Sequence, residues 1–184
     1  MTNPAIRSIW LRRMSALVLG AAGLLSVAAQ AARPALVEQA PRPDAPAFEL
    51  KGLDGRTYRL EDYRGHPVVV NFWATWCAPC LAEMPSMGRA QEALRETGVV
   101  FLAVNAGEEE AKVREAAGRL DTAIPVLLDP GMTEQQRWNL RGMPTTFVLD
   151  GEGRIAYRAE GGKLWDSPRL LDPIRALARP AGMN

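Results

Sequence analysis

The chain has 184 residues, with 22 basic and 21 acidic side chains and a formal net charge of +1 at pH 7. No basic tract stands out, so the electrostatic attraction on which nucleic-acid binding depends is missing. The length fits one domain with a single hydrophobic core, and the chain contains only two cysteines.

Residues 1–31 have the composition of a targeting segment. Three arginines form a basic start, the stretch 14–28 is uncharged and rich in Ala and Leu, and Ala29-Gln30-Ala31 fits the small-x-small pattern of signal peptidase sites. We expect either a cleaved signal peptide or an N-terminal membrane anchor, because the apolar stretch is close to the roughly 20 residues that span a bilayer. Both alternatives place the rest of the chain in the periplasm, a compartment that oxidises thiols.

Residues 32–46 are rich in proline and alanine and are predicted to form an extended tether. The folded domain is predicted to cover residues 47–184. Its first elements should be a short hairpin and one helical turn, at residues 47–50, 57–60 and 61–65.

The next apolar run, Val68 to Trp73, is β-branched and aromatic and is predicted to be a buried strand. A helix should run from Cys77 to about Glu96 and stop at Gly98. The remaining elements are predicted as strands at 99–105, 124–128, 145–149 and 155–160, and as helices at 108–120, 132–140 and 168–178. This order gives an α/β fold with a central mixed β-sheet flanked by helices.

Cys77 and Cys80 stand where the buried strand passes into a helix. A helix N-terminus has unpaired N–H groups and a partial positive charge, which favour a thiolate and can lower a cysteine pKa from about 8.5 to roughly 3.5–7.5. The thiolate is the attacking species in disulfide exchange. We therefore predict a redox-active disulfide, with Cys77 as the more exposed nucleophile and Cys80 as the thiol that resolves the mixed disulfide.

Three other interpretations of the cysteine pair were weighed against this one. A structural disulfide over two intervening residues would close little chain entropy. A zinc site needs more ligands, and His66 is the one histidine in the chain. A pair of inert core thiols is disfavoured by the flanking pattern. We therefore predict no metal and no cofactor.

Residues 72–80, taken together with Gly142-Met143-Pro144-Thr145-Thr146-Phe147, resemble the thioredoxin superfamily. Pro46 to Leu50 and Glu83-Met84-Pro85 narrow the resemblance to the membrane-tethered, extracytoplasmic TlpA/ResA/DsbE-like thiol–disulfide oxidoreductases, over about residues 44–180. The resemblance implies a thioredoxin-like sheet with an N-terminal β-hairpin extension.

The resemblance also implies a substrate-binding surface, in which we place Trp76, Met143, Pro144 and Thr145. Pro144 matches the family's cis-proline beside the redox pair, and the alternative is an ordinary trans proline at the start of a strand. The Met143 backbone would then pair with an incoming peptide as a short added strand. Trp76 would shield the cysteines and contact client proteins.

Glu83 is the implied acid–base group, because a carboxylate at this position serves the buried thiol in the family. The i, i+3 spacing puts it on the same side of a helix as Cys80, and partial burial would raise its pKa toward neutrality. The alternative is a surface glutamate on a solvated helix face. Asn71 stands where thioredoxin itself has a buried Asp, so we expect a hydrogen-bonding core residue there.

Two simpler expectations concern residues without assigned chemistry. Trp73, Trp138 and Trp165 should pack in the core. The run Glu108-Glu109-Glu110 should favour a helix N-terminus through the helix dipole.

The favoured function is a disulfide reductase. Strong oxidants owe their power to a stabilised reduced form, and Ala78-Pro79 offers no charged or imidazole group for that purpose. The resemblance implies a membrane thiol-electron donor, and clients such as apocytochrome c or the metal-site cysteines of oxidase assembly factors. Nothing in the sequence indicates an oligomer, so we expect a monomer. The alternative with the same chemistry is a disulfide-forming oxidant or isomerase.

Two further classes are less favoured. A thiol peroxidase needs Thr or Ser three residues before the reactive cysteine, where this chain has Ala74. A Cu(I)-binding chaperone would use the two cysteines as soft ligands. Met84, Met87 and Met143 lie nearby in sequence, but their spacing fits core packing better than metal binding.

Overall fold

The computed structural model of the protein describes residues 35–120 and 123–178, and the predicted targeting segment 1–31 lies outside them. Within the described residues, no helix has the length and apolar character that a membrane span requires. The strands are β1 (Val37–Glu38), β2 (Glu49–Gly52), β3 (Thr57–Arg59), β4 (Val68–Trp73), β5 (Val100–Ala106), β6 (Val126–Asp129), β7 (Thr145–Leu149) and β8 (Ile155–Glu160). The α-helices are α2 (Ala78–Leu94), α3 (Glu110–Ala117), α4 (Thr133–Arg137) and α5 (Pro168–Leu177), and the 3₁₀ turns are η1 (Leu60–Tyr63) and η2 (Arg95–Thr97).

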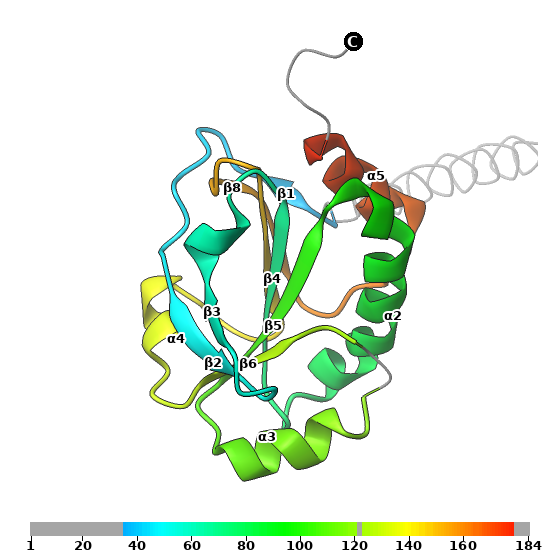
Figure 1. Cartoon of the computed structure of the whole chain (residues 1–184). Coiled ribbons are helices and arrows are strands. Elements are labelled where there is room, and N and C mark those ends of the chain that lie inside the picture. The colour runs from blue at the N-terminus through cyan, green and yellow to red at the C-terminus, as the bar shows by residue number, and fades with distance from the viewer. Residues whose placement is uncertain (1–34, 121–122, 179–184) are drawn as a thin grey trace, which may run out of the picture. The chain divides into compact units, whose positions relative to one another are not determined.

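The strands form one mixed sheet in the order β1-β8-β7-β4-β5-β6-β2-β3 (Figure 1). β4, β5 and β6 are parallel, whereas β7 pairs with β4 in the antiparallel direction and β8 with β7. The β2–β3 hairpin joins the far side of the sheet through antiparallel pairing of β2 with β6. The predicted fold, a mixed sheet between helices with an N-terminal hairpin extension, is confirmed.

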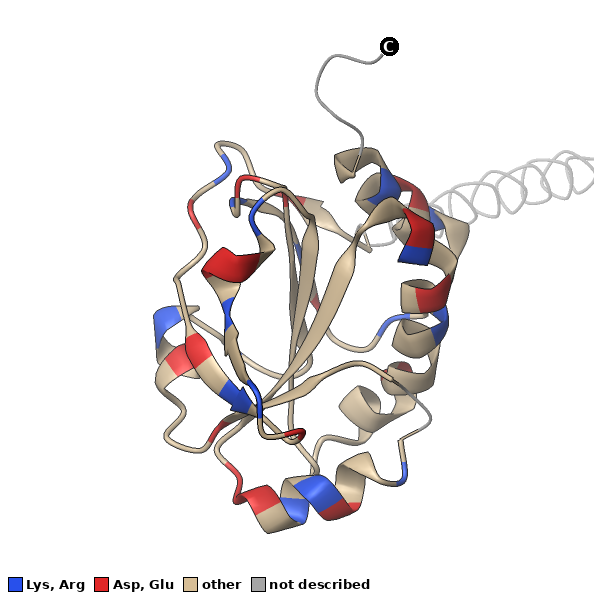
Figure 2. Cartoon of the chain, viewed as in Figure 1, with Lys and Arg blue, Asp and Glu red and all other residues tan. Residues whose placement is uncertain are grey.

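Each face of the sheet buries its own core because side chains alternate along a strand. Val69 and Val148 point to the face covered by α2, α3 and α5, whereas Val70 and Phe147 point to the opposite face. There Phe72, Phe147 and Trp138 pack ring against ring. The charged residues lie on the helices, the loops and the outer strands, whereas β4, β5 and β7 carry none (Figure 2). The central strands are therefore enclosed on both faces, and the carboxyl ends of β4 and β5 lie at the same edge of the sheet as the amino end of β7.

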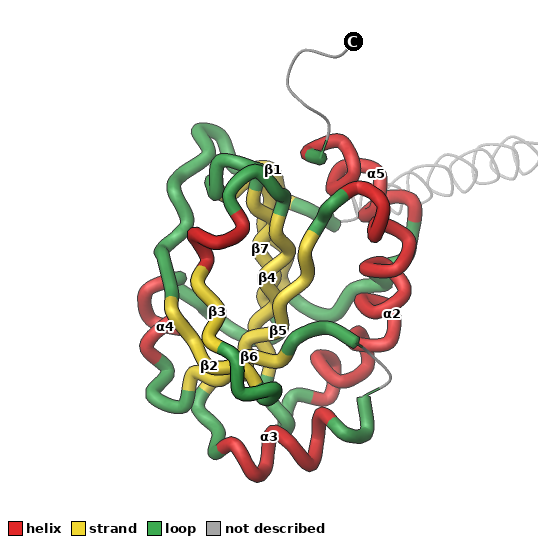
Figure 3. Tube along the Cα trace, in the orientation of Figure 1, coloured by secondary structure: helices red, strands yellow, loops and turns green. Residues whose placement is uncertain are grey.

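The segment before the first hairpin differs from the predicted tether of residues 32–46. β1 pairs with β8, and further along Gln39 N–H donates to Ala156 O at 2.9 Å and Ala45 N–H donates to Gly153 O at 3.1 Å. This part of the chain thus runs beside β8 at the edge of the sheet. Figure 3 shows the strands of the sheet between α4 on one side and α2 on the other. Proline and alanine side chains make few specific contacts, so the composition of this segment predicted a tether. Its backbone nevertheless forms hydrogen bonds with β8 and with the turn before β8.

Two predicted helices are shorter than expected. Residues 108–120 were predicted as one helix, but α3 begins only at Glu110, because the side chain of Glu108 is engaged elsewhere in the loop before it. Within 132–140, helix α4 is confined between Met132 and Asn139, which have φ values of 54° and 49°. Left-handed backbone of this kind interrupts a right-handed helix.

Candidate active site at the disulfide

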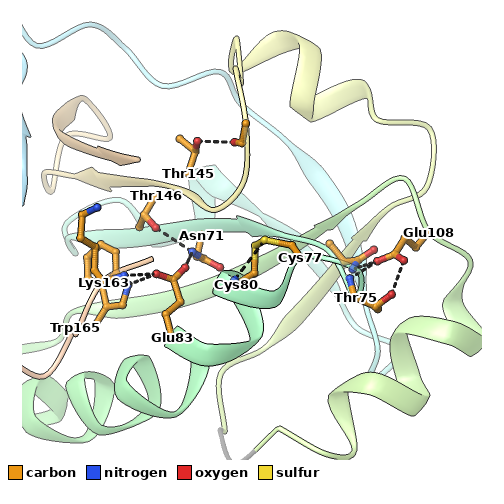
Figure 4. The surroundings of a disulfide bond; sticks show 12 residues. Asn71, Thr75, Cys77, Cys80, Glu83, Glu108, Thr145, Thr146, Lys163 and Trp165 are labelled. Atoms are coloured by element: carbon orange, nitrogen blue, oxygen red, sulfur yellow. Dashed lines mark hydrogen bonds between the residues drawn. A yellow bond between two sulfur atoms is a disulfide. The ribbon is translucent and has the colours of Figure 1, made fainter. Parts of the chain in front are cut away.

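The two cysteines form a disulfide at the start of α2, with an S–S distance of 2.03 Å (Figure 4). β4 ends at Trp73, and a tight turn follows in which Cys77 N–H donates to Ala74 O at 3.1 Å. Cys77 is the N-cap of α2, and its Sγ accepts from Cys80 N–H at 3.3 Å. The unpaired N–H groups of a helix start therefore face the sulfur on which a thiolate would form.

The burial of the two cysteines has the predicted order. Cys77 is 4% exposed, whereas Cys80 is fully buried. Beside them the Trp76 side chain is 66% exposed, which is unusual for a tryptophan in a small globular domain. A cysteine sulfur next to an exposed aromatic ring suits contact with another protein.

The segment before β7 lies against the end of β4, because Thr145 pairs with Phe72 in the sheet. The Met143–Pro144 peptide bond is cis, as the resemblance implied. Thr145 itself is only 1% exposed, and its hydroxyl donates to Gly142 O at 2.7 Å. The Thr145 side chain therefore braces this loop and does not offer a contact surface, unlike our sequence-based expectation.

Glu83 is buried, with 3% of its surface exposed, and the alternative of a solvated surface glutamate is wrong. One carboxylate oxygen accepts from Asn71 Nδ2 at 2.9 Å. The other accepts from the Lys163 backbone N–H at 2.9 Å and from Trp165 Nε1 at 3.0 Å. Figure 4 shows this group on the same side of the disulfide as Cys80. A carboxylate is thus held inside the protein, beside the more buried sulfur.

Burial raises the pKa of Glu83 above its ordinary value, although the hydrogen bonds from Trp165, Lys163 and Asn71 oppose this shift. The free-energy cost of removing the charged carboxylate from water is larger here than the stabilisation of that charge by the three hydrogen-bond donors. A carboxyl group with a raised pKa accepts a proton more readily than an ordinary glutamate does.

Asn71 is a fully buried core residue that links two elements. Besides its contact with Glu83, its Nδ2 donates to Thr146 Oγ1 on β7 at 2.9 Å. The expectation of a hydrogen-bonding core residue agrees with this geometry. Trp165 is also buried, as expected, but packing does not describe it fully because its indole N–H holds Glu83.

The raised pKa predicts a pH-dependent contribution of Glu83 to stability. Folded protein binds the Glu83 proton more tightly than the unfolded chain does, so the contribution is complete below the ordinary pKa of 4.5 and is lost as pH rises through the raised value. We therefore expect the free energy of unfolding of wild type to fall relative to that of Glu83→Gln as pH rises. The measurement is urea unfolding of both proteins between about pH 4 and about pH 8. A stability difference that did not change with pH would contradict the shift.

The arrangement defines a class of protein. A central strand leads through a turn into a helix whose first turn carries a Cys-x-x-Cys disulfide, and a cis-proline precedes the neighbouring antiparallel strand. These are the features of a thioredoxin-fold protein with a dithiol–disulfide site. The Redoxin family model matches residues 41–172, and the chain belongs to this family.

Named relatives agree with the resemblance predicted from the motifs. The chain is 40% identical over 111 residues to the thiol-disulfide oxidoreductase ResA of Geobacillus thermodenitrificans, which covers 60% of this chain and 64% of that protein. The match therefore spans slightly less than two thirds of that relative's length.

Solved structures are similar as well. A structure assigned as the thiol:disulfide interchange protein DsbE of Chlorobium tepidum has 28% identity and a TM-score of 0.71, covering 78% of this chain and 99% of its own. The exposed lipoprotein thioredoxin of Streptococcus pneumoniae has 35% identity and a TM-score of 0.61, covering 71% of this chain and 99% of its own. The predicted relation to ResA- and DsbE-like proteins is confirmed.

Proposed function

We propose that the protein is a periplasmic thiol–disulfide oxidoreductase that reduces disulfides in client proteins. The observation that carries the proposal is the Cys77–Cys80 disulfide at the start of α2, with the buried carboxyl group of Glu83 beside Cys80. The names of the ResA- and DsbE-like relatives support the reaction type. An Ala78-Pro79 pair without charge favours the reducing direction, because nothing in it stabilises the thiolate strongly.

The reaction begins with the reduced pair. The Cys77 thiolate attacks one sulfur of the client disulfide, so that a Cys77–client bond forms while the client S–S bond breaks. The released client sulfur leaves as a thiolate and takes a proton from water. The helix N-terminus and the Cys80 N–H keep the Cys77 sulfur in its ionised form for this attack.

The second step needs a base. Cys80 passes its proton to the Glu83 carboxylate and attacks the Cys77 sulfur, which forms the Cys77–Cys80 disulfide and expels the second client thiolate. Two electrons have then moved from the protein to the client. Glu83 suits this step because burial raises its pKa, which makes its carboxylate a better proton acceptor than that of an ordinary glutamate.

The surface around Cys77 is where a client protein would make contact. In this proposal Trp76 provides an exposed apolar contact, and the backbone of Met143 pairs with an extended client segment beside Pro144. Thr145 supports the same loop from beneath through its bond to Gly142. This surface would contact the client through backbone hydrogen bonds and one aromatic side chain. Such contacts depend little on the client's sequence, which suits a protein with several clients.

A reductase in an oxidising compartment must be reduced again after each cycle. We propose that a membrane thiol-electron donor performs this step, and that residues 1–31 act as a signal peptide or an anchor that brings the protein to the membrane surface. The clients in this proposal are apocytochrome c or metal-site cysteines of assembly factors, and the protein acts as a monomer.

The test is the redox state of Cys77 and Cys80 in living cells. Cells are quenched with acid, free thiols are alkylated with a large reagent, and the gel shift reports the reduced fraction. We expect a mostly reduced pair that becomes oxidised when the membrane donor is removed. A pair that stays oxidised with the donor present would assign the protein to the oxidants or isomerases instead.

A further inference from the structure

The turn that leads to Cys77 is hydrogen-bonded to a side chain from another loop. Thr75 and Trp76 are the two central residues of this turn, which the Cys77 N–H closes by donating to Ala74 O. The Thr75 backbone N–H and the Thr75 hydroxyl both donate to the carboxylate of Glu108, each at 2.6 Å. Figure 4 shows this contact on the opposite side of the disulfide from Glu83.

Glu108 lies in the loop between β5 and α3 and has all its acceptor positions engaged. The oxygen that accepts from the Thr75 N–H also accepts from Asn105 Nδ2 at 2.9 Å. The other oxygen pairs with Lys112 Nζ at 2.6 Å. The Glu108 side chain is only 4% exposed, whereas that of Lys112 is 58% exposed. A buried carboxylate with four donors is a rigid attachment point.

Glu108 is ionised near neutral pH. Burial would raise its pKa, but the donors Lys112, Thr75 and Asn105 lower it to about 2. The other charged groups that line the same pocket are Glu49 and Lys51 of β2, and Glu109 and Glu110 at the start of α3. The attachment therefore does not loosen through protonation near neutral pH.

We propose that Glu108 is a positioning residue that fixes the Ala74–Cys77 turn and so keeps the Cys77 sulfur at the N-terminus of α2. Without this hold the exposed part of the turn, Thr75 and Trp76, loses its attachment to the β5–α3 loop, and Cys77 is held less firmly as the N-cap. The helix N-terminus stabilises a thiolate only over its first turn, so a looser Cys77 is a weaker acid. This inference rests on the proposed function, in which Cys77 is the nucleophile.

The test uses Glu108→Gln in protein that also carries Cys80→Ser, so that Cys77 is the one reactive thiol. Glutamine replaces one acceptor oxygen with an NH₂ group, so at least one of the four donors loses its partner. We expect the pKa of Cys77, read from the pH dependence of iodoacetamide alkylation, to rise by about half a unit, and the alkylation rate at a pH below that pKa to fall about threefold.

Two further variants make the result specific. Thr75→Val keeps the charge of Glu108 and removes only the hydroxyl donor, and it should raise the Cys77 pKa by a smaller amount. If Glu108→Gln does not fold, the Cys77 pKa of Thr75→Val tests the positioning role in its place. Glu110→Gln removes a charge of the same sign from the exposed start of α3 and should leave the Cys77 pKa unchanged.

A fall in the Cys77 pKa in Glu108→Gln would mean that only the field of the carboxylate acts on the thiolate, and it would overturn the positioning role. An unchanged pKa would overturn it as well. The measurement needs no client. If Glu108→Gln shifts the pKa as expected but the protein with both cysteines reduces no client disulfide, the proposed function fails while the positioning role stands.

Discussion

Replacing Cys77 by serine is expected to abolish the reduction of client disulfides. A serine hydroxyl is not ionised near neutral pH, and disulfide exchange proceeds only through a thiolate. Cys80 cannot take over, because it is fully buried behind Cys77. The measurement is the reduction of a synthetic peptide disulfide by prereduced protein, and we expect no rate above that of the peptide alone.

The matched control is Cys80→Ser, which leaves the nucleophile in place and removes the resolving thiol. This variant should form a stable mixed disulfide with the peptide through Cys77, visible as a mass increase that dithiothreitol reverses. If Cys80→Ser gave free reduced peptide, or if Cys77→Ser trapped the peptide, the two roles would be assigned the wrong way round.

Glu83→Gln is expected to slow turnover by about a hundredfold near neutral pH, the lower end of the range for general acid–base groups. Glutamine has nearly the same shape but cannot accept the Cys80 proton. Its rate should therefore recover as pH approaches about 8.5, where a free thiol ionises by itself. The pH–rate profile of peptide reduction would thus move to the alkaline side.

Glu92→Gln provides the control for this experiment. Glu92 lies on the same helix, but its side chain is 74% exposed, and its partner is the neighbouring Arg95. It should leave both the rate and the pH profile as in wild type. An unchanged profile in Glu83→Gln, with the fold intact by circular dichroism, would show that Cys80 loses its proton to another acceptor.

Local sequence patterns predicted much of the fold. β4, β7 and β8 occupy the predicted residues, because runs of β-branched and aromatic side chains between turn signals define buried strands well. The helix after Cys77 likewise ends near Gly98, whose φ of 76° fits a glycine stop. Strands of this kind and the end of this helix are determined by residues that are close together in the sequence.

Contacts between distant segments were less accessible from the sequence. The burial of Glu83 depends on Lys163 and Trp165, which lie 80 and 82 residues further along the chain. Glu108 was expected only to favour a helix start, whereas its carboxylate reaches Thr75, 33 residues before it. A spacing of three residues indicates a shared helix face, but it does not show which distant loop covers that face.

The edges of the sheet have a consequence for the proposed function, in which the protein meets client polypeptides that are incompletely folded. Such chains expose strands that readily add to an open sheet edge and then co-aggregate. Here residues 37–45 lie along β8, and the opposite edge is β3, with three residues and an Arg59–Glu49 ion pair. Under the proposed function, a client chain thus finds little free edge on which to add a strand, which disfavours co-aggregation with the protein.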